Sequence, residues 1–149
     1  MVSILNTTTC LLICGDPLDF SLITEKLKLS PTNVTHKGEL ILPSIMDGAA
    51  RNYDYRLGFD CWKVGLTSKQ SRFDIDKQLE FWIEKLYPVR SAFQEFNRLG
   101  YWSVIDCQIA SYEPQLPSIQ FRLTKETQLK LSKICIDIDF TISRPVEKA

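Results

Sequence analysis

The stretch "TTTCLLICGDPLDFSLITEKLKLSPT", residues 7–32, predicts a strand, a sharp corner and a helix in direct succession. Its apolar first half is typical of a buried strand. The Gly-Asp-Pro sequence at residues 15–17 interrupts that strand. Asp19 or Ser21 then caps a short amphipathic helix over residues 19–28, and the Ser-Pro dipeptide after it ends the helix.

A glycine-bearing corner in front of a helix N-terminus is a place where many proteins hold phosphate. This corner has a single glycine, and the chain contains neither a GxGxxG nor a GK[ST] motif. The carboxylates of Asp16 and Asp19 repel phosphate, although they suit the positive end of a helix. We therefore interpret the corner as a capped structural turn.

The composition predicts one folded domain over residues 1–149, because 44% of the residues are hydrophobic and 24% are charged. We expect an ordered core over about residues 8–142 and a short tail at 143–149. Residues 40–57 mix Pro, Gly, Asn and Asp with two tyrosines, which predicts a long loop. Long loops inside compact domains often have a function.

The balance of charge argues against a nucleic-acid-binding protein. Lys plus Arg equals Asp plus Glu, at 18 each, so no basic excess is present to neutralise a phosphate backbone. The N-terminal apolar run is short and has no Lys or Arg before it, which predicts neither a signal peptide nor a membrane span.

The five cysteines are odd in number and form no CxxC motif, which favours a reduced, cytoplasmic protein. Cys10 and Cys14 are four residues apart and share one face of a strand. Zinc-type spacing is absent, so we expect core packing there, with no metal and no cofactor.

The strongest helical signal is "FDIDKQLEFWIEKLYPVRSAFQEFNRLGY", residues 73–101. Pro88 divides it into two helices, and Gly100 terminates the second. The first helix has one apolar stripe, made of Ile75, Leu79, Trp82, Ile83 and Leu86. In the second helix the inward positions are Val89, Phe93, Phe96 and Leu99.

The C-terminal third contains two segments that alternate between apolar and polar residues, at 102–111 and 134–142. Such alternation indicates strands with one exposed side. Between them, residues 119–123 predict a short strand, and Thr124 caps a helix from which Leu129 faces the core. The buried face of the first segment consists of Ile105, Cys107 and Ile109, and that of the second consists of Ile136, Ile138, Phe140 and Ile142.

These elements predict an α+β fold with a mainly antiparallel sheet and helices packed on one face. We expect a two-layer sandwich related to the ferredoxin-like arrangement. The other face of the sheet is then open and polar.

The same residues resemble a known family. The segments "LLICGDPLDFSLITEKLKLSPT", "HKGE", "CWKVGL" and "FRLTKETQLKLSKICIDIDFTI" resemble the bacterial domain-of-unknown-function family 4279 over about residues 8–142. The resemblance implies a small cytosolic bacterial α+β domain and no assigned chemistry.

Carboxylates on the polar side of the alternating segments are the first candidate site. Asp137 and Asp139 share a strand face, and Asp106 with Gln108 lies on a strand that we expect beside it. Paired carboxylates bind metals or transfer protons. The alternatives are a solvated sheet face and a recognition surface.

Aromatic residues are the second candidate. Trp62, in a strand over residues 59–66, is either a core residue or an exposed platform beside Tyr53 and Tyr55. Trp82 and Trp102 are interpreted as core or helix-packing residues.

Two functions follow from these patterns. The first is a non-catalytic binding or protein-interaction module, for example of the immunity type, in which an acidic sheet face masks a basic protein partner. The second is a small-molecule-binding domain or modest enzyme with a pocket between the 40–57 loop and the sheet. We favour the first and expect no catalytic residues, because His36 is the only histidine and no nucleophile–base set accompanies it. The oligomeric state stays open.

Overall fold

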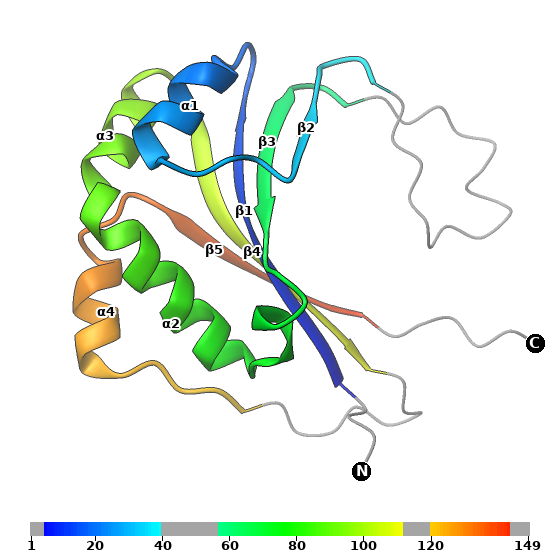
Figure 1. Cartoon of the computed structure of the whole chain (residues 1–149), viewed down its shortest axis with the longest axis vertical. Coiled ribbons are helices and arrows are strands. Elements are labelled where there is room, and N and C mark those ends of the chain that lie inside the picture. Colours follow the sequence, from blue (N-terminus) through cyan, green and yellow to red (C-terminus); the bar gives the residue numbers. More distant parts are fainter. Residues whose placement is uncertain (1–4, 40–56, 112–119, 144–149) are drawn as a thin grey trace, which may run out of the picture.

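A computed structural model describes residues 5–39, 57–111 and 120–143, which form an α+β fold with helices on one face of a sheet (Figure 1). The five strands follow the order β2-β3-β1-β4-β5 across the sheet. The strands are β1 (Leu5–Gly15), β2 (Asn33–Thr35), β3 (Asp60–Gly65), β4 (Trp102–Ser111) and β5 (Asp137–Ser143). The helices are α1 (Phe20–Leu27), α2 (Ile75–Leu86), α3 (Arg90–Arg98) and α4 (Lys125–Leu131), with 3-10 turns η2 (Gln70–Arg72) and η3 (Tyr87–Val89).

The sheet is mixed, so the prediction of a mainly antiparallel sheet is wrong. β1 pairs antiparallel with both β3 and β4, and β2 pairs antiparallel with β3, but β4 and β5 run parallel. Parallel neighbours need a crossover connection, and α4 lies in that connection. Alternation of apolar and polar residues is the same in both directions, so the pattern alone did not reveal the parallel pair. The ferredoxin-like relation stays a prediction.

Carboxylates hold the corner at residues 15–17. Asp19 Oδ1 accepts a hydrogen bond from Leu22 N at 3.1 Å and caps α1. Asp60 Oδ2, from β3, accepts one from Leu18 N at 3.0 Å. Because the protein's own carboxylates occupy backbone N–H groups that an anion would use, the geometry supports the interpretation as a structural turn.

Gly15 is required at this corner by close packing. A Cβ atom there would lie 2.8 Å from Leu18 Cδ2 and 2.9 Å from Tyr101 Cδ1. Tyr101 also accepts a hydrogen bond at its hydroxyl from Asp19 N, at 3.0 Å. Tyr101, which directly precedes β4, therefore links the N-terminus of α1 to the sheet.

The apolar stripe predicted for α2 is confirmed, because all five of its residues are buried in the core. In α3, Phe93 and Phe96 are buried as predicted. Leu99 is 50% exposed, against the prediction, because it lies beyond the last turn of α3 as its C-cap.

The region around α4 differs from the prediction in two respects. Leu129 is 64% exposed, whereas Thr127 is buried. Positions 127 and 129 are two residues apart, which is about 200° of rotation around a helix, so only one of these two side chains can face the core. Residues 120–123, the described part of the predicted strand, form no strand. Thr124 caps α4 as predicted, and Ile134 is buried.

A buried polar network joins α2 to β1. Trp82 Nε1 donates to Thr9 Oγ1 at 2.9 Å, and Thr9 Oγ1 donates to Gln78 Oε1 at 3.0 Å. Gln78 Nε2 donates to the backbone oxygens of Thr7, at 3.0 Å, and Phe73, at 2.7 Å. Throughout the described ranges every buried side-chain nitrogen and oxygen has a hydrogen-bond partner. The polar groups of this network are therefore buried without an unpaired donor or acceptor.

We expect Thr9→Val to destabilise the fold. The change keeps the side-chain volume but leaves the Trp82 indole N–H and the Gln78 carbonyl buried without partners. The free energy of unfolding should fall by about 2–6 kcal/mol, since each of the two unpaired buried groups costs about 1–3 kcal/mol. Urea denaturation measures this. Thr8→Val, at an exposed position on the other face, is the control, and equal losses in the two variants would contradict the assignment.

Asp60 gives the corner a pH dependence. Its carboxylate accepts hydrogen bonds from Leu18 N and from Lys37 N, at 3.0 and 2.8 Å, and these bonds hold the pKa of Asp60 below its usual value. A lowered folded-state pKa contributes stability that is present above the unfolded pKa and is lost as pH falls through the folded pKa.

We therefore expect Asp60→Asn to lower stability at neutral pH and to reduce the loss of stability that occurs below about pH 4. Thermal unfolding between neutral and acidic pH measures both effects. Asp74→Asn is the matched control, because the Asp74 side chain makes no capping hydrogen bond. An unchanged acid profile in Asp60→Asn would refute the role of the carboxylate.

Candidate functional site

The face of the sheet turned away from the helices, here called the open face, is the candidate site (Figure 1). Successive side chains of a strand alternate between faces, and the helix-side positions such as Leu11, Trp62 and Ile105 are buried in the core. Strand register places the intervening positions on the other side. The open face includes Thr35, Cys61, Lys63, Cys10, Leu12, Cys14, Trp102, Val104, Asp106, Gln108, Asp137, Asp139 and Thr141.

Three carboxylates gather where β4 meets β5, and we call Asp106, Asp137 and Asp139 the acidic cluster. Asp106 is the register partner of Asp139, and Asp137 lies two residues earlier on the same side of β5. Gln108 Nε2 donates to both oxygens of Asp106, at 3.0 and 3.2 Å. Within the described ranges none of the three forms an ion pair. The cluster therefore concentrates negative charge that no ion pair among the described residues neutralises.

Trp102, the first residue of β4, adds an apolar surface near the acidic cluster. Its side chain is 45% exposed and contacts the Phe59 ring edge-on, with centroids 4.9 Å apart. The core interpretation of Trp102 is therefore wrong. The sequence pattern could have predicted this exposure. Ile105, Cys107 and Ile109 alternate toward the core, which places the even-numbered positions of this strand, Trp102 included, on the open face.

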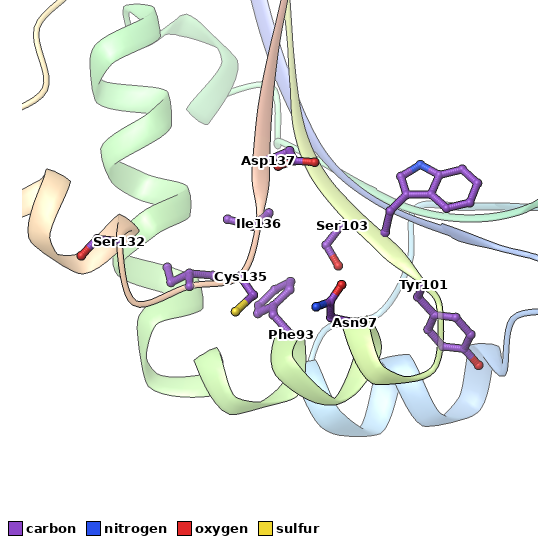
Figure 2. A pocket seen from close by; sticks show the side chains of 10 residues that line it. Phe93, Asn97, Tyr101, Ser103, Ser132, Cys135, Ile136 and Asp137 are labelled. Carbon is purple, nitrogen blue, oxygen red and sulfur yellow. The ribbon is translucent and has the colours of Figure 1, made fainter.

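A cleft of about 410 Å³ lies beside the acidic cluster, where β4 and β5 begin. Figure 2 shows the side chains of α3, β4 and the α4–β5 connection around it, with Asn97 and Ser103 pointing toward one another. Trp102 and Asp137 line the cleft as well. The cleft is therefore continuous with the open face through two shared residues.

The aromatic candidates have different outcomes. Trp62 is fully buried, and its Nε1 donates to Thr24 Oγ1 at 3.1 Å, so it belongs to the core and is no exposed platform. Tyr53 and Tyr55 lie outside the described residues, as does the predicted loop except for residue 57. A pocket against that loop therefore remains a prediction.

The single histidine and the acidic and thiol side chains show no metal-binding arrangement in the described part of the chain. His36 is exposed and packs edge-on against Phe20, with ring centroids 5.1 Å apart. Among residues 5–39, 57–111 and 120–143, no three His, Cys, Asp or Glu side chains are grouped to hold a metal ion. Nor does this part of the chain contain a helix long and apolar enough to cross a membrane.

The fold and the site define an α+β protein with a mixed sheet and an open face that carries a cluster of three aspartates. The model of a family described as a domain of unknown function, DUF4279, matches residues 6–144, and the chain belongs to this family. The resemblance found in the sequence is thus confirmed. No curated protein and no solved structure matches the chain.

We expect the acidic cluster to cost stability, because like charges at paired strand positions repel by up to about 1 kcal/mol. Asp139→Asn should raise the free energy of unfolding by about 0.3–1 kcal/mol at low salt. The gain should shrink at about 0.5 M salt, where charges are screened. Urea denaturation at the two salt concentrations tests this against Glu80→Gln, which removes one exposed charge from α2. A salt-independent gain, or a loss, would refute the repulsion.

Proposed function

We propose that this protein is a non-catalytic protein-interaction module whose open face binds a basic protein surface. The acidic cluster carries the proposal: Asp106 and Asp139 occupy paired positions with no ion pair among the described residues. Neutral residues there would favour the fold, so a use in binding accounts for the carboxylates better than stability does.

The physical basis of binding is charge complementarity. Lys or Arg side chains of a partner would relieve the repulsion inside the acidic cluster as they dock, and a negative face speeds the encounter with a positive one. The exposed indole of Trp102, beside Phe59, supplies the aromatic anchor that binding hot spots use. Because the acidic cluster and Trp102 both lie on paired strands, their relative positions are fixed before the partner binds.

An immunity-type role, in which the module masks a basic toxin, is one form of this function. A bacterial, cytoplasmic setting fits the sequence resemblance and the odd number of cysteines. The partner is then a basic protein made in the same cell.

A second candidate function is small-molecule binding in the cleft. Its volume of about 410 Å³ falls within the range of ligand sites. Asn97, Ser103 and Asp137 supply polar groups around it. A ligand screen by thermal shift tests this candidate, since a binder raises the apparent stability by mass action.

The decisive experiment uses the tagged protein to capture binding partners from an extract of the cells that naturally make it. It compares the wild type with two variants in which carboxylates are replaced by neutral amides. Asp137→Asn/Asp139→Asn removes two charges from the open face, and Glu25→Gln/Glu80→Gln removes two exposed charges from the helices. A specific basic protein captured by wild type should be retained by the helix variant. Its Kd, measured by calorimetry, should rise about tenfold or more in the open-face variant, equivalent to about 1.4 kcal/mol.

Salt provides an independent check. The wild-type association rate should fall as ionic strength rises, because screening removes electrostatic steering. Equal affinity of both variants for the partner would place the binding surface elsewhere and refute the proposal. Capture of no specific protein, with a hit in the ligand screen, would favour the cleft.

A further inference from the structure

Cys14 and Cys61 lie opposite each other on the open face, on the β1–β3 pair and away from the acidic cluster. They are register partners, and Cys14 Sγ donates a hydrogen bond to Cys61 Sγ at 3.4 Å. The Cα atoms of register partners in antiparallel strands lie about 4.5–5.5 Å apart, within the span that a disulfide bridges. A bond between them therefore needs no rearrangement of the strands.

The two sulfur atoms are not equivalent. Cys61 is half-buried, whereas Cys14 is only 3% exposed. The hydrogen bond from Cys14, with the charge of Lys63 and the hydroxyl of Thr35, holds the pKa of Cys61 below its usual value against the opposing effect of burial. The same hydrogen bond and burial raise the pKa of Cys14. Since the thiolate is the reactive form, Cys61 is the nucleophile of the pair.

We propose that Cys14 and Cys61 form a thiol–disulfide exchange site that reacts with small organic disulfides, RSSR. The Cys61 thiolate attacks one sulfur of RSSR, the S–S bond breaks, and RS⁻ leaves. Cys14 then loses its proton and attacks the Cys61 sulfur, which displaces the second RS⁻. The protein thiols lose two electrons and become one disulfide, while RSSR is reduced to two RSH that take up the two protons.

The remaining cysteines lack this geometry. Burial raises the pKa of Cys10 to about 11 and that of Cys107 to about 12, so both stay protonated at neutral pH. Cys135 is exposed and lines the cleft on the far side of β4 from the pair. It therefore serves as a control for accessibility alone.

The test treats the reduced protein with excess oxidised glutathione and follows it by thiol titration, intact mass and peptide mapping. Of the five thiols, two should be lost, with a crosslink between the Cys14 and Cys61 peptides. Cys14→Ser should accumulate one glutathione on Cys61, because the second thiol is missing. Cys61→Ser should leave Cys14 unmodified, and Cys135→Ser should form the crosslink at the wild-type rate.

A second measurement needs no variant. Limiting iodoacetamide should label Cys61 of the reduced wild-type protein at least tenfold faster than Cys14. Retention of five thiols, stable glutathione on wild-type Cys61, a crosslink between other cysteines, or faster labelling of Cys14 would each overturn the proposal. Circular dichroism confirms that each variant is folded. These results do not depend on the proposed interaction function.

Discussion

The rest of the structure depends on one constraint: β1 is paired along both edges, and one of its faces is packed into the hydrophobic core under the helices. Thr9, Leu11 and Ile13 lie under the helices, and Thr9 is linked to α2 through Gln78 and Trp82. A slip of one residue would turn every side chain of the strand to the opposite face. The buried hydrogen bonds oppose such a slip, because any other register leaves them unpaired. Because β3 and β4 both pair with β1, its register also determines which of their side chains face the helices.

The open face is a consequence of that constraint. Helices on one side leave the other side to residues that need no burial, so a charged and aromatic surface forms without loss to the core. Asp106 and Asp139 adjoin because β5 returns parallel to β4 in one register. A different register would separate the charges. The acidic cluster therefore depends on the same backbone pairing that stabilises the sheet.

The thiol pair and the acidic cluster occupy different parts of one surface. Cys14 and Cys61 join β1 to β3, whereas the carboxylates lie along β4 and β5. Trp102 lies between the two, because it is the register partner of Cys14 at the beginning of β4. Exchange chemistry at the thiols would thus take place beside the apolar end of the proposed interaction surface, and the two proposals meet at this residue.

The sequence by itself determined what depends on near neighbours in the chain. The α2 stripe, the caps at Asp19 and Thr124, and the shared face of Asp137 and Asp139 all follow from local periodicity and hydrogen bonding. The buried side of the short helix α4 was harder to predict from the sequence, because a small rotation of the helix exchanges its buried and exposed residues. Strand order and direction depend on contacts between distant residues, and alternation is identical for parallel and antiparallel pairs. The sequence predicted neighbouring strands for Asp106 and Asp139, but only the tertiary structure gave the register that pairs the two residues, and only it placed Cys14 against a cysteine 47 residues away.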